Sequence, residues 1–195
     1  MKIEKECVTF SSGYNEDNKT TIGNLWYKLV NLDITISEKL NAKGSDSKKK
    51  IGATISLFGF YLIWIISVII SIISHQFYII LIIGISISIT IIVILPIKRV
   101  INRCRPIGRN LITNKYLKPK SASFPSGHTF FTILTVLIIG IYLGNSFILI
   151  IAFLLGILVG YSRIYLGVHY FSDVLFSYLL ASLIGTIFIL IHNLF

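Results

Sequence analysis

Residues 77–97 read FYIILIIGISISITIIVILPI, an apolar run without a charged side chain. Its length matches the roughly 20 residues that a helix needs to cross the hydrocarbon core of a bilayer. Four similar runs lie around it, at 51–74, 126–143, 146–161 and 173–192. In lipid only helices and closed barrels satisfy their backbone hydrogen bonds, and these runs lack the alternation of barrel strands. The sequence therefore predicts an all-α membrane bundle of about five transmembrane helices.

The composition supports a membrane protein. The chain has 195 residues, of which 54% are hydrophobic and only 13% are charged, and such a chain is too apolar for an ordinary soluble domain. Its net charge of +10 is typical of nucleic-acid binding, but no Lys or Arg occurs in 51–97 and a basic cluster follows at 98–120. Because these cations lie at the ends of apolar segments, we expect the bilayer, and not nucleic acid, to be the partner.

The N-terminal part differs from the rest. Residues 1–21 are polar and predict a flexible tail, without the apolar core of a signal peptide. Residues 22–44 have near-helical apolar spacing that charges such as Asp33 interrupt, which predicts an amphipathic helix in the membrane interface. We therefore expect a single membrane domain at 22–195 with its transmembrane bundle at 51–195, in a multi-pass protein of the cell membrane. The sequence does not indicate an oligomeric state.

Small residues organise the later runs. Gly144-Asn145 predicts a turn between the runs at 126–143 and 146–161. Ala152, Gly156 and Gly160 recur every four residues, and this spacing predicts close contact between helices.

Polar residues gather in two connections. With five spans, the connections 98–125 and 162–172 emerge on the same side of the bundle. The residues of interest in these connections or directly after them are Lys98, Arg105, His128, Arg163, His169 and Asp173. Asp173 is the one carboxylate side chain after Asp46. We expect the other basic side chains of this region to reach lipid headgroups: Arg99, Arg103, Arg109, Lys115, Lys118 and Lys120.

Two local patterns suggest chemistry. Ser126 would cap a helix whose first N–H groups could hold an anion, and Gly127 would let that anion approach the backbone. His169 and Asp173 are four residues apart, so on a continuous helix the carboxylate could orient the imidazole. Either pattern alone could be purely structural.

Phosphoryl transfer requires such groups together: donors for the phosphoryl oxygens, a nucleophile and a proton donor for the leaving oxygen. The candidate phosphate-binding residues are Lys98, Arg105, Ser126, Gly127 and Arg163, and the candidate catalytic residues are His169 as nucleophile, His128 as proton donor and Asp173 as the group that orients His169.

Three segments carry a family resemblance: KRVINRCRP at 98–106, PSGH at 125–128 and SRIYLGVHYFSD at 162–173. They resemble the motifs K-x6-R-P, P-S-G-H and S-R-x5-H-x3-D of the type-2 phosphatidic acid phosphatases. The resemblance implies a phosphohistidine on His169, oriented by Asp173, with His128 protonating the leaving group. The family core usually has six helices, whereas here the first helix is expected to be interfacial.

Other functions remain to be weighed. A metal-dependent phosphatase is disfavoured because one Asp cannot supply the oxygen ligands of such a site, and the surrounding cations disfavour zinc; we expect no metal and no cofactor. Vanadate haloperoxidases resemble the family in their motifs but are soluble. A non-catalytic protein that binds or transports a lipid phosphate would not need His128, His169 and Asp173 together.

The substrate and the orientation stay open. The resemblance allows polyprenyl diphosphate, phosphatidylglycerophosphate, phosphatidate and related lipids. We favour an isoprenoid diphosphate such as undecaprenyl diphosphate, on the small size of the chain alone. The basic excess favours a cytoplasmic site, whereas carrier recycling in related proteins places it on the outer face.

Overall fold

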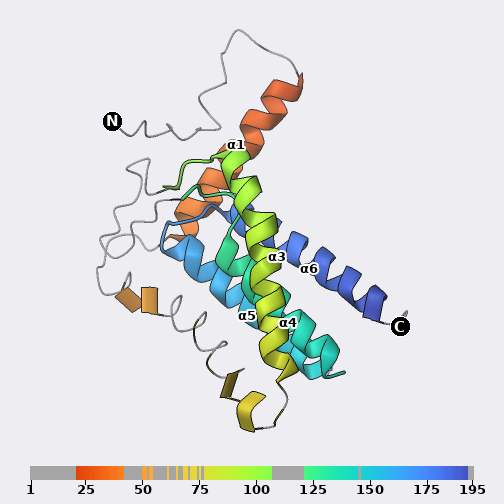
Figure 1. Ribbon diagram of the computed structural model, residues 1–195. Helices are drawn as coiled ribbons and strands as arrows, with labels where there is room; N and C mark the ends of the chain where they lie inside the picture. Colours follow the sequence, from red (N-terminus) through yellow and green to blue (C-terminus); the bar gives the residue numbers. More distant parts are fainter. Residues whose placement is uncertain are drawn as a thin grey trace, which may run out of the picture.

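The computed structural model contains a bundle of helices (Figure 1). It describes residues 21–41, 77–106, 121–144 and 146–192, together with isolated positions between 50 and 75. The helices are α1 (Thr21–Leu40), α3 (Tyr78–Ile101), α4 (Gly127–Tyr142), α5 (Ser146–Tyr165) and α6 (Phe171–His192). The all-α prediction is confirmed, since the described part of the chain contains no strand.

Each apolar run whose residues are described forms a helix. The runs at 77–97, 126–143, 146–161 and 173–192 correspond to α3, α4, α5 and α6. The run at 51–74 lies mostly outside the described residues, as does the predicted tail. The predicted turn follows α4, where Gly144 has the positive φ of +60° that favours glycine.

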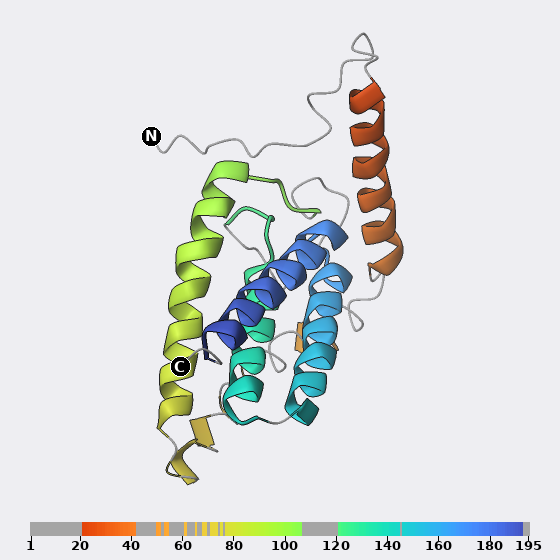
Figure 2. The ribbon, with the colours of Figure 1, turned by 90° about the vertical axis from the view of Figure 1, so that its right-hand side faces the viewer.

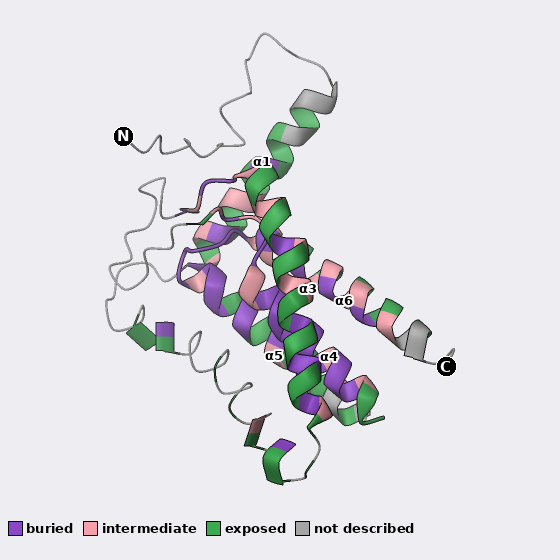
Figure 3. Cartoon of the chain, viewed as in Figure 1, coloured by how far each residue is buried: buried purple, intermediate pink, exposed green. Residues whose placement is uncertain are grey.

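Helix α4 is the central element of the bundle. Nearly all of its residues from Thr129 to Gly140 are buried, and it packs against α3, α5 and α6 (Figures 2 and 3). Its Phe130 and Leu134 are fully buried and meet Ile79 and Ile83 of α3 in the main apolar cluster. A helix that is apolar on every side is buried among other helices or spans a membrane, and α4 is buried among other helices.

The outer faces of the bundle are apolar. Large side chains such as Leu81 and Ile92 of α3, Phe147 of α5 and Leu183 of α6 are more than half exposed. Within the described part of the chain, two segments are long and apolar enough to cross a membrane, Tyr78–Ile101 and Phe171–Phe188. An exterior of this kind suits lipid and not water.

Glycines allow close packing of α5, as the four-residue spacing predicted. A Cβ at Gly156 would lie 2.5 Å from the Ile133 side chain of α4, and a Cβ at Gly160 would lie 2.6 Å from Val174 of α6. Both distances are shorter than van der Waals contact, so glycine lets α5 approach its neighbours.

Helix α1 lies beside the bundle, on the opposite side from α3 in Figure 2. It contacts α5 and α6 near the end of α5 and the start of α6. The helix predicted at 22–44 is therefore present, beginning at Thr21 and ending at Leu40. Its position in the membrane interface stays a prediction.

Candidate active site

Two helices extend further than their apolar runs. Helix α3 continues to Ile101 and α5 to Tyr165, so Lys98, Ser162 and Arg163 lie in last helical turns. The prediction that these residues belong to connecting loops is wrong. Their backbone is helical. This is possible because each of these helix ends lies at the polar end of the bundle, where the charged side chains do not face lipid.

A tight turn ends α5 and begins the segment that carries His169. Gly167 has φ of +68°, and its N–H donates to Ile164 O (2.8 Å) while the Val168 N–H donates to Arg163 O (3.2 Å). This is the Schellman pattern of helix termination, which requires a left-handed residue. Residues 166–170 thus form a short loop between α5 and α6, here called the nucleophile loop after the role predicted for His169.

His169 lies in this loop and Asp173 in the first turn of α6, because α6 begins at Phe171. The prediction that both share one continuous helical face is therefore wrong, although they do meet. His169 Nδ1 is 3.4 Å from Asp173 Oδ2, longer than an ordinary hydrogen bond. Both side chains are buried, His169 at 2% exposure and Asp173 at 0%.

The Asp173 carboxylate is held by several donors. Arg103 Nη1 donates to Oδ1 (2.6 Å), and Oδ2 accepts from Ser123 Oγ and from the Tyr170 N–H (2.9 Å). Oδ2, the oxygen that faces His169 Nδ1, thus already accepts two hydrogen bonds, which is consistent with the long 3.4 Å separation from Nδ1. This carboxylate is therefore fixed in place before any substrate binds.

The other side of the imidazole faces Arg105. His169 Nε2 is 3.3 Å from Arg105 Nη1, and because a guanidinium can only donate, Nε2 is the acceptor of that contact and carries the lone pair. Burial lowers the pKa of His169 well below its usual range, Asp173 opposes the shift and Arg105 adds to it. At neutral pH the imidazole is therefore uncharged, which is the state that the predicted nucleophile requires.

Arg105 is held by backbone oxygens. It donates to Val168 O (2.8 Å), Ser121 O (2.7 Å) and Ala122 O (3.2 Å). Burial lowers its pKa to about 10 and Asp173 partly offsets this shift, so the guanidinium is charged at neutral pH. It fixes the 121–122 segment and the nucleophile loop at the same time.

The remaining predicted cations lie at the same end of the bundle. Lys98 Nζ donates to Ala122 O (2.7 Å), and Arg163 is buried at 5% exposure. Lys98 interacts electrostatically with Arg105 and Arg163, and His128 with all three cations. The structure thus gathers the predicted cations and both histidines around one region.

The start of α4 joins this region through the backbone. Ser126 is the N-cap residue, and its own N–H donates to Asp173 O (3.3 Å). Its side chain does not cap the helix as predicted; instead Ser126 Oγ and Thr129 Oγ1 share a hydrogen bond of 3.0 Å. The first-turn N–H groups from Gly127 onward therefore have no cap from Ser126 Oγ, and they are the donors expected to receive an anion.

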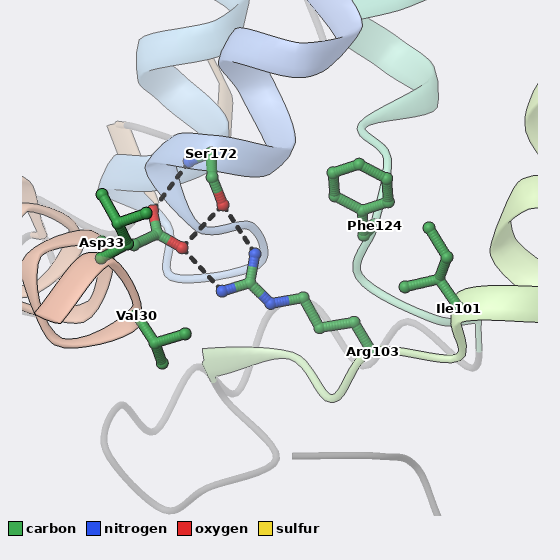
Figure 4. A pocket seen from close by; sticks show the side chains of 7 residues that line it. Val30, Asp33, Ile101, Arg103, Phe124 and Ser172 are labelled. Atoms are coloured by element: carbon green, nitrogen blue, oxygen red, sulfur yellow. Dashed lines mark hydrogen bonds and ion pairs between the residues drawn. The ribbon is translucent and has the colours of Figure 1, made fainter. Parts of the chain in front are cut away.

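Arg103 and Asp33 are components of the site that the sequence did not reveal. Arg103 was expected at the lipid headgroups, but it is buried at 5% exposure and its Nη2 donates to Asp33 Oδ2 (2.6 Å). Figure 4 shows Arg103, Asp33 and Ser172 joined along one wall of a cavity of about 380 Å³ whose other walls include Val30, Ile101 and Phe124. The available signal was a polar stripe at four-residue spacing: Asp33, Ser37 and Asn41.

A metal site was not expected from the sequence. Among the described residues, no group of three His, Cys, Asp or Glu side chains is placed to hold a metal ion. The donors around the predicted site are instead cations and N–H groups, which suit an anion. The use of no metal and no cofactor stays a prediction.

The fold and this arrangement define a helical membrane protein of the lipid-phosphatase class, a hydrolase of phosphate bonds. Residues 77–195 match the family model described as PAP2 superfamily, and the chain belongs to that family. No curated protein sequence matches the chain.

Two solved structures are similar in fold. One is a transmembrane PAP2 type phosphatidylglycerolphosphate phosphatase from Bacillus subtilis, with a TM-score of 0.63. Its sequence is 23% identical to this one, over 88% of this chain and 87% of that chain. The other is Aquifex aeolicus LpxE, with 22% identity over 80% of this chain and 93% of that chain and a TM-score of 0.59. At these identities the likeness concerns the fold alone.

Proposed function

We propose that this protein removes a phosphate group from a lipid phosphate or an isoprenoid diphosphate through a phosphohistidine on His169, without a metal. The observation that carries the proposal is the setting of the His169 imidazole, with Nε2 3.3 Å from Arg105 Nη1 and Nδ1 3.4 Å from Asp173. A neutral imidazole between a cation and a fixed carboxylate is arranged to attack an anion bound at that cation.

In the first step His169 Nε2 attacks phosphorus. A bond forms between Nε2 and phosphorus while the bond from phosphorus to the leaving oxygen breaks, and His128 gives that oxygen a proton. Lys98, Arg105 and Arg163, together with the N–H groups of the α4 start, stabilise the charge on the other phosphoryl oxygens. Asp173 stabilises the positive charge that develops on the His169 ring.

His128 takes up the proton of the first step when the negative charge of the bound phosphate offsets the three cations around it. In the second step water regenerates the enzyme: His128, now neutral, accepts a proton from water as the water oxygen attacks phosphorus and the bond to Nε2 breaks. The products are inorganic phosphate and either a lipid alcohol or a lipid monophosphate. The same side chain serves as acid and then as base because the attacking water takes the place that the leaving oxygen had in the first step.

Residues 22–195 form, in this proposal, one membrane domain with residues 1–21 as a tail. The phosphate binds at the polar end of the bundle while the lipid chain remains among apolar side chains. Undecaprenyl diphosphate is the substrate that we favour. Phosphatidylglycerophosphate is the main alternative, and it is the substrate named for the similar Bacillus subtilis structure.

The test is a panel of lipid phosphates and diphosphates offered to the purified protein in detergent, with phosphate release as the measurement. We expect release in the presence of EDTA and inhibition by vanadate, since vanadate imitates the phosphoryl group. His169→Ala should release no phosphate while remaining folded. Loss of activity on chelation would overturn the metal-free mechanism, and lipid binding without any phosphate release would favour a binding or transport protein.

A further inference from the structure

The polar stripe of α1 contacts both ends of the nucleophile loop, residues 166–170. Asn41, directly after α1, donates from Nδ2 to Tyr165 O (2.9 Å) and Ile164 O (3.3 Å), at the end of α5. Helix carbonyls at this position have no partner within their own helix. Because Ile164 O already accepts from the Gly167 N–H, Asn41 chiefly supplies a donor to Tyr165 O, at the end of the helix from which the loop departs.

The same stripe caps the helix into which the loop runs. Ser37 Oγ accepts from the Phe171 N–H (2.9 Å), and Asp33 Oδ1 accepts from the Ser172 N–H (2.8 Å). These are first-turn N–H groups of α6, where an acceptor, and particularly an anion, is favourable. Asp33 and Ser37 are four apart and so lie on one face of α1, and Asn41 continues this spacing directly after the helix.

Arg103 connects the polar stripe of α1 to Asp173, the residue proposed to orient His169. Its guanidinium donates from Nη2 to Asp33 (2.6 Å; Figure 4). It also donates from Nη1 to Asp173 (2.6 Å), so one planar cation bridges the two carboxylates. Its central carbon also lies 3.9 Å from the centre of the Tyr170 ring, a residue of the nucleophile loop. Replacing Asp33 would leave the Arg103–Asp173 pair, whereas removing Arg103 would leave the buried Asp173 carboxylate without this counter-charge.

The position of His169 depends on these contacts. Asp173 is the group that orients the His169 ring, and its Oδ1 is held by Arg103. A displacement of Asp173 would move the imidazole or change which nitrogen carries the proton, and displacements of about 1 Å can cost on the order of 100-fold in rate.

We propose that α1 is a positioning element of the active site: Asp33, Ser37 and Asn41 clamp the nucleophile loop, and Asp33 acts through Arg103 to fix Asp173 and thereby His169. This inference rests on the proposed function for its kinetic consequences. Neither Asp33 nor Arg103 touches the phosphate in this scheme, so both are positioning residues.

The kinetic test compares Asp33→Asn and Arg103→Ala with matched controls. The controls are Glu38→Gln, on the same helix as Asp33, and Arg99→Ala, an exposed arginine near the same end of α3. We expect kcat per folded site to fall about 10-fold for Asp33→Asn and about 100-fold for Arg103→Ala, with KM within about twofold of wild type because the phosphate-binding cations are intact. The two controls should match wild type in both constants.

Two further measurements separate positioning from a loss of folding. Because Asp33 acts through Arg103, adding Asp33→Asn to Arg103→Ala should lower kcat no further. Guanidinium ion, at concentrations far below denaturing ones, should restore part of the kcat of Arg103→Ala from the adjoining cavity, whereas sodium ion should not. A drop in the amount of folded protein with kcat per folded site unchanged would overturn the proposal.

A readout without substrate completes the experiment. The protein has four histidines, and ¹⁵N labelling with His169→Gln as the assignment control identifies the His169 signals. We expect one tautomer, protonated at Nδ1, in the wild type and a mixture of tautomers in Arg103→Ala. Unchanged kcat and unchanged tautomer in that variant would overturn the positioning role. A wild type that hydrolyses no lipid phosphate, with the tautomer still altered by Arg103→Ala, would overturn the proposed function and leave the clamp in place.

Discussion

The protonation state of His169 follows from its surroundings. The side chain is 2% exposed, and burial lowers its pKa well below the usual range. The folded protein therefore keeps this ring neutral under conditions in which an ordinary imidazole takes up a proton. A nucleophile needs this state, because a protonated nitrogen has no lone pair to give.

Stability should depend on pH through this residue. Below about pH 6.5 the unfolded chain binds a proton at position 169 that the folded chain does not bind, so stability falls as the pH drops, by up to about 1.4 kcal/mol per pH unit. We expect His169→Gln to lose this part of the slope between about pH 6.5 and 5. Unfolding in detergent across that range measures it.

The matched control is His75→Gln, which changes an exposed histidine and should keep the slope of the wild type. If His169→Gln and wild type lose stability in parallel as the pH falls, the buried ring is charged in the folded state and the neutral nucleophile is wrong.

The positions of the motif residues could be predicted from the sequence better than the residues that hold them in place. Lys98, Arg105, Arg163 and His169 could be placed together because two connections emerge on one side of the bundle. Arg103 could not be separated from its basic neighbours, since spacing in an irregular segment does not tell which side chain turns inward. Its partner Asp33 lies 70 residues away in the sequence, and nothing local indicates that the two meet.

At the scale of the helix, the length of an apolar run predicted well that a helix forms, and less well where that helix ends. Helices α3 and α5 continue past their last apolar residues through Lys98 and Arg163. An apolar run ends where the lipid ends, whereas a helix ends where its hydrogen bonds end. Here residues with positive φ follow each helix, Asn102 (+43°) after α3 and Gly167 (+68°) after α5. The difference matters because these last turns carry phosphate-binding candidates.

Packing of α5 makes its glycines sensitive. Gly156→Ala would force the Ile133 side chain of α4 to move, because the added Cβ lies 2.5 Å from it. We expect a loss of about 1–3 kcal/mol in stability, the usual cost of overpacking, seen as a lower thermal midpoint in detergent.

Gly84→Ala is the control for this change. Gly84 is also helical, but a Cβ there meets nothing within 4 Å, so the midpoint should stay the same or rise slightly. Equal losses at the two positions would show that close approach of α5 to α4 is not what requires glycine.

For the molecule as a whole, hydropathy alone predicted an all-α membrane bundle. The runs lack the alternation of barrel strands, so a helical bundle is the architecture that remains possible in lipid. The docking of α1 was not predictable in the same way, because it depends on a few polar contacts with α5, α6 and Arg103 rather than on an apolar face.

The apolar exterior should tolerate charge only near its polar end. Ile92 and Val100 of α3 are exposed at 69% and 84%, and they lie roughly 12 Å apart along the helix. Ile92→Arg, near the middle of α3, should cost about 2.5–3.5 kcal/mol, whereas Val100→Arg, beside the basic end, should cost little. The yield of folded protein extracted from membranes measures both, and equal yields would contradict this placement in the bilayer.

The clamp also sets an order of events during synthesis. The interhelical bonds of Asp33, Ser37 and Asn41 reach partners 70 to 139 residues later in the chain. The ribosome therefore synthesises α1 long before the residues that α1 contacts. The nucleophile loop lacks its hydrogen bonds to α1 until the first turn of α6 has been translated and inserted. We therefore expect a stalled nascent chain that stops short of Phe171 to release no phosphate from a lipid, and hydrolysis to begin only when the bundle is nearly complete.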